Sequence, residues 1–308
     1  MPAILFSGLL CIVSQAAPEG TKEAQPTQKL FDTPQQAAES LVQAAASFQV
    51  LALKEILGPD SEDIVASEDP AMDKQRTLAF AAKAKEKQAI EIDPANPNQA
   101  TLSVGEDAFP LPIPIVKKDG KWSFDTAAGR DEILNRRIGA NELDAIEICR
   151  GFVEAQHEYA AEKHDGSMVH QYAQRIISTP GKQDGLAWKN AGTWEGPVGE
   201  EIAKALTQGY SPKDKPQPYH GYYFKVLKGQ GPAAPLGQLD FVINDAMIGG
   251  FALAAAPAEY QVTGVKTFIV SHTGIVHEKD LGKDTLDAFQ KLELFNPDDS
   301  WKPTEDEW

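Results

Sequence analysis

Cysteine is scarce in this chain, and positive charge is outweighed by negative charge. The 308 residues include only Cys11 and Cys149, too few thiols for a disulfide framework or a cysteine-ligated zinc cluster. There are 29 lysines and arginines against 45 aspartates and glutamates, which gives a formal net charge of −16. Such an excess repels phosphate backbones and anionic lipid headgroups. We therefore expect no nucleic-acid partner.

Long hydrophobic runs are missing after the first segment, so we expect no transmembrane segment in the mature chain. The opening residues 1–16 are mostly small or aliphatic and end in Ser14-Gln15-Ala16, which favours signal-peptidase cleavage before Ala17. No basic residue precedes Lys22, and this predicts a signal peptide with a truncated n-region. We expect an exported protein, periplasmic or envelope-associated. A buried N-terminal helix and a lipoprotein with its lipid on Cys11 are the alternatives.

The mature chain is predicted to be α+β, with helices packed on small antiparallel sheets in two domains. A polar stretch over residues 17–30 is typical of a linker, and the first domain is expected over 31–138. Apolar residues at three- and four-residue steps predict helices, and alternation around an Asp119-Gly120 turn predicts strands. We expect a cone-like sheet wrapped on a helix. The predicted elements are helices over 34–48, 50–57 and 73–87, an acidic loop over 60–69, and strands or extended segments over 89–92, 100–104, 109–116 and 121–125.

The second domain is expected over residues 139–295, with a long helix followed by an antiparallel sheet. Its helix is predicted to begin near Asn141, a capping residue, and to end near Lys163. Cys149 falls in the apolar stripe of that helix, which predicts a buried, inert thiol. The acidic tail over 296–308 is expected to be mobile. The other predicted elements are short helices over 172–177, 200–206 and 285–295, and strands over 221–227, 240–243, 250–255, 266–271 and 275–278.

Residue spacing argues against the common metal and nucleotide sites. A zinc-binding helix needs two histidines one turn apart, but seven positions separate His157 from His164. No Gly-x-Ser-x-Gly elbow is present, and Gly229-Gln230-Gly231 lacks the lysine and the following helix of a phosphate loop. We therefore expect no metal and no cofactor.

Two kinds of candidate site residue stand near glycines, which allow close backbone approach. Asp184 and His220 are the candidate catalytic residues, because a carboxylate can orient a histidine that titrates near neutrality. The alternative is structural, with Asp184 capping a turn and His220 ending a strand. Aromatic rings could form a platform for a glycan or peptide, with core packing as the alternative. These candidate ligand-binding residues are Trp188, Trp194, Tyr219, Tyr222 and Tyr223.

Five motifs follow one another in the second half of the chain, over residues 172–188, 219–224, 249–260, 263–270 and 279–282. Together they resemble domain-of-unknown-function family 2950, a bacterial family of exported proteins. The resemblance extends from about Phe31 to Leu292. Ala187 stands where the family pattern has an aromatic residue, and Gln261 where it has a glycine. The resemblance implies export and no particular activity, because none is established for the family.

Residues 221–280 are also weakly similar to the sheet region of pilin-like envelope proteins. There a strand, an apolar strand ending in Ala-x-Pro and a hairpin containing Thr-Gly follow one another. The hydrophobic pilin helix and its processing site are absent from this sequence, so the similarity implies a related fold rather than a filament.

These observations lead to a functional hypothesis with two alternatives. The hypothesis is a non-catalytic binding or assembly module whose partner is an envelope protein or a glycan. The first alternative is a periplasmic hydrolase that acts on a cell-wall or peptide substrate through Asp184 and His220. The second is a filament-associated subunit, which requires an exposed apolar patch on the C-terminal sheet.

Overall fold

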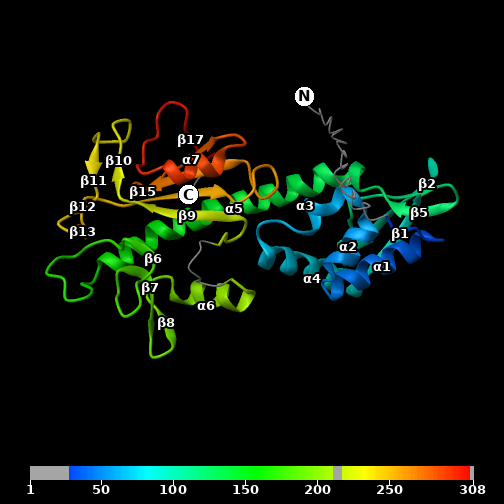
Figure 1. The fold of residues 1–308 in the computed structure, drawn as a ribbon, viewed down its shortest axis with the longest axis horizontal. Helices are drawn as coiled ribbons and strands as arrows, with labels where there is room; N and C mark the ends of the chain where they lie inside the picture. Colours follow the sequence, from blue (N-terminus) through cyan, green and yellow to red (C-terminus); the bar gives the residue numbers. More distant parts are fainter. Residues whose placement is uncertain (1–27, 211–216, 306–308) are drawn as a thin grey trace, which may run out of the picture.

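The computed structural model describes residues 28–210 and 217–305. The predicted signal peptide, and the linker up to residue 27, lie outside the described residues. The described chain is α+β, and two clusters of buried hydrophobic residues form separate cores along one long helix, α5 (Figure 1). We call residues 28–125 the N-terminal half and residues 161–305 the C-terminal half.

Helix α5, Thr126–Ala160, runs through both halves and has 35 residues, equivalent to about 52 Å. Asp125 caps it by accepting a hydrogen bond from the Ala128 N–H (3.4 Å). The prediction that this helix begins near Asn141 is wrong. No proline interrupts residues 126–160, and Asn141 lies inside the helix with 1% exposure. The domain boundary predicted at 138–139 therefore falls inside one continuous helix.

The helices of the N-terminal half begin as their capping residues predict. Thr33 accepts a hydrogen bond from the Gln36 N–H and Pro34 follows it in the first turn. Asp69 and Pro70 repeat this arrangement at α4. The acidic stretch predicted as a loop contains two short helices, so that prediction is wrong in part. The helices are α1 Pro34–Ala46, α2 Val50–Leu57, η1 Pro59–Ser61, α3 Glu62–Val65 and α4 Pro70–Glu86.

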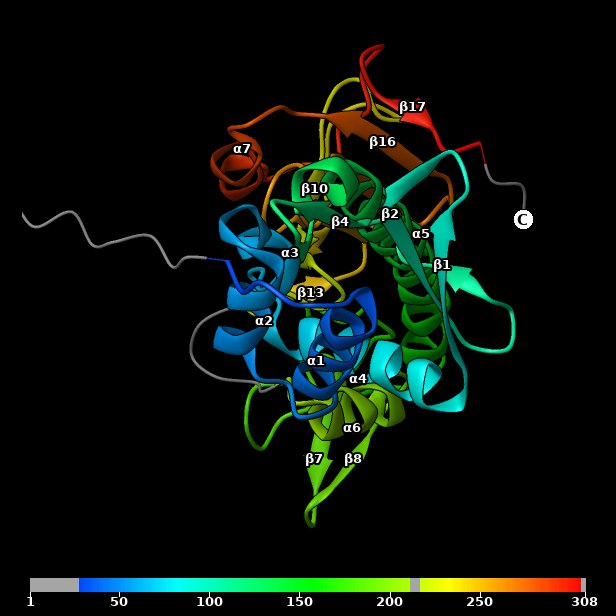
Figure 2. The same cartoon turned by 90° about the vertical axis from the view of Figure 1, so that its right-hand side faces the viewer.

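A five-stranded antiparallel sheet completes this half, with order β1-β2-β4-β5 and β3 beside β2. The proline-rich stretch 109–116 breaks into β3 and β4, because proline cannot donate a ladder hydrogen bond. Helices α1 and α2 pack against the sheet, and Figure 2 shows this half end-on. The strands are β1 Gln88–Asp93, β2 Asn96–Val104, β3 Phe109–Pro110, β4 Ile115–Lys118 and β5 Lys121–Phe124.

The C-terminal half is built on an antiparallel sheet of order β17-β16-β15-β14-β9. Helices α5 and α7 pack on its two faces (Figure 1). Every residue of β14 is buried, and its alanines let both helices approach closely. The Cys149 thiol on α5 is fully buried, as predicted, and burial raises its pKa to about 12. The elements are β9 Tyr222–Leu227, β14 Ala252–Pro257, β15 Lys266–Ser271, β16 Val276–Asp280, β17 Lys302–Pro303 and α7 Thr285–Lys291.

Smaller elements surround this sheet. The helix predicted over 172–177 is wrong, because Tyr172 pairs with Met247 and β6 runs parallel to β7. These pairings with β7, ten positions along the chain, and with the distant Met247 outweigh the local helical pattern. The remaining elements are β6 Arg175–Ile177, β7 Gly185–Asn190, β8 Thr193–Glu195, α6 Gly199–Gln208, β10 Gly229–Gln230, β11 Leu239–Asp240, β12 Val242–Ile243 and β13 Ala246–Met247.

The acidic tail is ordered as far as it is described, which overturns the prediction of mobility for that part. Lys302 pairs with Glu278 across β17 and β16, and Trp301 packs against the hydrophobic core with Lys279 Nζ 5.7 Å from its ring centroid. Residues 306–308 lie outside the described residues. Within residues 28–210 and 217–305, no helix combines the length and apolarity needed to cross a bilayer.

Candidate functional site

A group of polar side chains lies where the two halves meet. They come from the start of α4, the middle of α5, the end of α6, the start of β9 and the loop after β14. We call this group the junction network. Its members are Asp69, Arg76, Asn141, Asp144, Tyr210, His220, Gly221 and Thr263.

Asp69 joins three elements through one carboxylate. It caps α4 by accepting from the Met72 N–H (3.0 Å), and it accepts from the Gly221 N–H (2.8 Å) and the Tyr210 hydroxyl (3.0 Å). Asp69 is 2% exposed, so these donors replace the water that a carboxylate would otherwise need. Burial, followed by the nearby Asp69 charge, raises the pKa of Tyr210. Tyr210 therefore stays neutral and acts as a donor.

His220 forms a carboxylate–imidazole pair, but with Asp144 of α5. Its Nδ1 lies 2.7 Å from Oδ2 of Asp144, while its Nε2 is buried and has no hydrogen-bond partner within residues 28–210 and 217–305. The φ of His220 is +51°, a conformation that residues other than glycine adopt only where the surroundings impose it. The imidazole of His220 thus has one nitrogen bonded to a carboxylate and one without a hydrogen-bond partner among the described residues.

Asn141, on α5, links α4 to the loop after β14. Its Oδ1 accepts from an Arg76 guanidinium N–H (2.5 Å), and its Nδ2 donates to the Thr263 carbonyl oxygen (2.7 Å). Gly221 lies against this amide: a Cβ there would be 2.4 Å from Asn141 Nδ2, and its φ is +76°. Only glycine fits both the space and the backbone conformation.

Ionised side chains beside the junction network are also paired internally. Arg137 donates to the Asp63 carbonyl oxygen (2.5 Å) and lies 3.9 Å from Asp73, and both side chains of this ion pair are almost fully buried. Burial raises the pKa of Asp73, although the hydrogen bonds from Ser67 and the charge of Arg137 oppose it. Burial also lowers the pKa of Arg137. These groups hold the helices together rather than facing a ligand.

Asp184, the other candidate catalytic residue, caps the turn that precedes β7. It accepts from the N–H (2.7 Å) and hydroxyl (2.8 Å) of Thr179, and Arg175 lies 3.5 Å away. Burial raises the pKa of Asp184, but the hydrogen bonds from Thr179 and the charge of Arg175 outweigh it and the pKa is lowered. Asp184 therefore contributes stability above its unfolded pKa, and that contribution is lost as the pH falls through the folded pKa.

The structure does not join Asp184 to His220. No hydrogen bond or ion pair connects the two side chains in the described part of the chain, and each has other partners. The acid/base pair expected from the sequence is thus replaced by Asp144 and His220. Asp144 was missed because it lies 76 positions before His220.

The candidate aromatic residues do not form one platform. Trp188 pairs with Glu195 and Trp194 with Lys189 in the β7–β8 hairpin, so the two indoles lie on opposite faces. Tyr222 is fully buried and donates to the Lys266 carbonyl oxygen (2.9 Å), as core packing predicts. Tyr219 meets Tyr210 edge to face, with 4.9 Å between ring centroids. Tyr223 is half-buried on β9.

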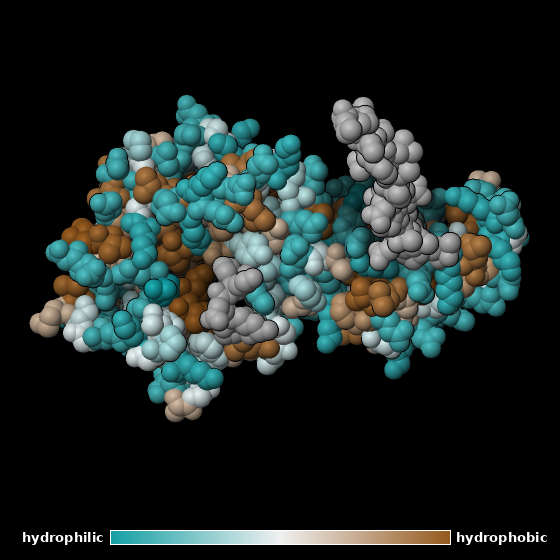
Figure 3. Space-filling view, viewed as in Figure 1, coloured by the Kyte–Doolittle hydropathy of each residue, from teal (hydrophilic) through white to brown (hydrophobic). Residues whose placement is uncertain are grey.

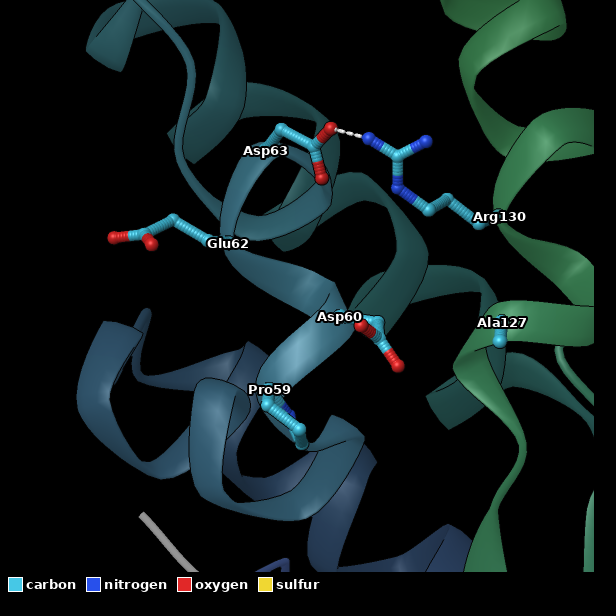
Figure 4. Close-up of a pocket in the computed structure, with 6 residues that line it drawn as sticks. All are labelled: Pro59, Asp60, Glu62, Asp63, Ala127 and Arg130. Carbon is cyan, nitrogen blue, oxygen red and sulfur yellow. Dashed lines mark hydrogen bonds and ion pairs between the residues drawn. The ribbon is translucent and has the colours of Figure 1, made fainter. Parts of the chain in front are cut away.

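A surface pocket lies elsewhere, between η1, α3 and the start of α5 (Figure 4). In Figure 4 the Arg130 guanidinium points to Asp63, with which it forms an ion pair. Glu62 extends away from that pair and binds Lys54 (2.9 Å). Glu62, Asp63 and Arg130 of the pocket are therefore engaged in fastening α3 to its neighbours. The pocket is lined by Pro59, Asp60, Glu62, Asp63, Ala127 and Arg130.

Exposed apolar side chains of the C-terminal half do not gather on the five-stranded sheet. They lie on loops and on the two-stranded hairpins, while β14 is wholly buried and β15 almost so. The patch that a filament-associated subunit requires is not found on the described sheet. The exposed residues are Met168, Val169, Leu236, Leu239, Ile243, Ile248 and Ile275.

Comparison with known proteins places the whole described fold in one family. A family model with the description "Protein of unknown function (DUF2950)" matches residues 28–304. The chain belongs to this family. The match confirms the resemblance carried by the motifs of residues 172–282. DUF2950 membership indicates no activity, and the junction network lies within the matched residues.

Two further comparisons gave no match. No curated protein and no solved structure matches the chain. Nothing therefore supports the similarity to pilin-like proteins that residues 221–280 suggested.

Proposed function

We propose that this DUF2950 protein is an exported, non-catalytic binding module of the bacterial cell envelope. The observation that carries the proposal is the use made of the candidate acid/base groups. Asp184 caps a turn, and Asp144, His220 and Asp69 bond within the junction between the halves. Of these side chains only His220 keeps a ring nitrogen, Nε2, without a partner among the described residues; the others are held by the fold and are not free to cycle protons with a substrate. The partner is an envelope protein or a glycan.

The proposal of export rests on the sequence of the residues that precede the described chain. The apolar stretch 1–16 and the small residues before Ala17 support it. We expect protein recovered from its native cells to begin at Ala17. Peptide mass spectrometry of fractionated cells checks this, and an intact Met1 terminus in the cytosolic fraction would contradict export.

One observation favours the hydrolase as a second candidate, with a different pair of residues. His220 is oriented by Asp144, and its buried Nε2 has no partner in the part of the chain that the structure describes. A general base that is to accept a substrate proton needs such an oriented imidazole with one nitrogen left over. Among the described residues no serine, threonine or cysteine reaches that nitrogen. A hydrolase would therefore activate water rather than an enzyme nucleophile.

The two candidates differ in what the protein releases from purified peptidoglycan. For the binding module we expect no soluble fragments with either the wild-type protein or His220→Ala, measured by chromatography of the supernatant. Release by the wild type that His220→Ala abolishes, while Asp184→Asn retains it, would replace the binding module with the hydrolase. The Asp184 variant is the matched control because that carboxylate lies outside the junction network.

A further inference from the structure

Strand β9 forms one edge of the five-stranded sheet, and the two edges of this sheet differ. At the other edge β17 has only two residues and contains Pro303, and short edge strands with proline resist further pairing. Strand β9 has six residues, from Tyr222 to Leu227, and no proline. Among the described residues its partner in the ladder is β14 alone.

The register shows which backbone groups of β9 point away from the sheet. The Ala258 N–H donates to the Gly221 carbonyl oxygen (2.9 Å), and antiparallel partners alternate along a strand. Tyr223, Lys225 and Leu227 therefore bond to β14, while Tyr222, Phe224 and Val226 direct their N–H and C=O groups outward. Tyr222 confirms that these residues face outward, because its backbone exchanges hydrogen bonds with that of Tyr219 (2.8 and 3.1 Å) on the outer side.

This leaves an open window on the edge of β9. Tyr219 closes the window at one end, and at the other the Lys228 carbonyl oxygen accepts from the Phe241 N–H (2.9 Å). Between them the N–H and C=O groups of Phe224 and Val226 bond to no described residue. Two donors and two acceptors in strand spacing match the backbone of an extended chain.

Side chains at the window favour an apolar partner. Phe224 and Val226 are half-buried and pack against the core. Figure 3 shows a hollow with hydrophobic residues in the C-terminal half, between β9 and the β6–β8 unit as they lie in Figure 1. The other open edge of comparable length, β1, carries Glu91 and Asp93 and is mostly exposed, so charge protects it. Strand β9 carries one charge, Lys225, whose ammonium is engaged by the Gln290 carbonyl oxygen (3.1 Å) and the Glu293 carboxylate (3.3 Å).

Charge at the window favours a basic residue in the partner. Burial and then the carboxylates of Glu68 and Asp69 raise the pKa of Tyr223. Burial and then the carboxylates of Asp144 and Glu201 raise the pKa of Tyr219, and the charge of Lys204 opposes them only in part. The end of the window next to Tyr219 is therefore negative, in keeping with the net charge of −16. A lysine or arginine of a bound segment would lie favourably there.

We propose that the outer edge of β9 binds an extended peptide segment of a partner protein by β-strand addition. Backbone hydrogen bonds to Phe224 and Val226 hold the segment, apolar side chains at alternate positions meet the hollow, and a basic residue lies next to Tyr219. This inference rests on the proposed binding function, which it deepens by naming the partner chemistry. A peptide partner takes the place of a glycan.

Amide hydrogen exchange, followed by NMR on the full chain, tests the window directly. In the free protein we expect the Phe224 and Val226 amides to exchange at least roughly tenfold faster than those of Tyr223 and Lys225, which bond to β14. Heptapeptides selected from a phage-displayed library should share alternating apolar residues and a basic end, and should slow exchange at Phe224 and Val226. Equal protection in the free protein, or bound peptides that leave both amides unchanged, would overturn the proposal.

A pair of variants separates edge binding from other contacts. Val226→Pro removes an outward N–H without touching the β14 ladder, and should weaken peptide binding roughly tenfold. Val226→Thr keeps the N–H and the branched shape, and should stay within about threefold of the wild type. Equal affinities of the two variants would contradict the proposal, and the exchange data on wild-type protein decide it if Val226→Pro does not fold. Fragment release from peptidoglycan would refute the binding module without altering these exchange rates.

Discussion

Gly221→Ala should destabilise the protein by about 2 to 5 kcal/mol. An alanine in the left-handed region costs about 1 to 2 kcal/mol, and overpacking of a buried site about 1 to 3 kcal/mol. The new Cβ would lie 2.4 Å from Asn141 Nδ2 and 3.0 Å from Thr263 Cβ. Asn141 cannot move aside, because it is 1% exposed and bonded at both ends of its amide. The free energy of unfolding from urea titration measures the effect.

Gly166→Ala is the matched control for this substitution. Gly166 has nearly the same backbone conformation, with φ of +72°, but a Cβ there would meet no atom within 4 Å. We expect this control to lose only the stability that the left-handed backbone conformation costs an alanine, about 1 to 2 kcal/mol. Equal losses of stability in the two variants would contradict the tight contact between Gly221 and Asn141.

Asp69→Ala should cost about 2.5 to 8 kcal/mol. The change removes the cap of α4 and leaves the Gly221 N–H and the Tyr210 hydroxyl without their buried acceptor. A lost cap costs about 0.5 to 2 kcal/mol, and each buried donor left unsatisfied about 1 to 3 kcal/mol. Thermal and urea unfolding followed by circular dichroism measure the loss.

Asp125→Ala provides the comparison for Asp69→Ala. Asp125 also caps a helix, but its carboxylate accepts one long hydrogen bond from Ala128 (3.4 Å) and lies 3.7 Å from Lys118. This variant should lose no more than a cap is worth, about 0.5 to 2 kcal/mol. Asp69→Ala combined with Tyr210→Phe should cost less than the two single changes summed, because both remove the same hydrogen bond. Additive losses would contradict the junction network.

Elements specified by neighbouring residues were predictable from the sequence. The Thr33-Pro34 start of α1, the turn at Asp119-Gly120 and the buried strand β15 all appear as expected. Capping, turn formation and strand alternation depend on residues a few positions apart. The start of α5 was not predicted, because Asn141 can either cap a helix or lie within one. Its bonds to Arg76 and Thr263, 65 and 122 positions away, show why it lies within the helix.

The candidate site, too, was predictable only as far as it depends on neighbouring residues. Histidine near glycines indicated His220, and its partner is a carboxylate, as expected for an oriented imidazole. The identity of that carboxylate depends on how α5 lies against β9, which no local pattern contains. Asp184 has the same chemistry but is held by Thr179, five positions away.

Taken alone, the amino-acid sequence determined the acidic charge, the shortage of thiols, the family and most of the helices and strands, because each depends on composition or on near neighbours. Tertiary structure decided that one helix serves both halves, that His220 meets Asp144, and that the edge of β9 is left open between Tyr219 and Lys228. These features depend on contacts between residues far apart in the chain. Such contacts form only when the two cores pack along α5.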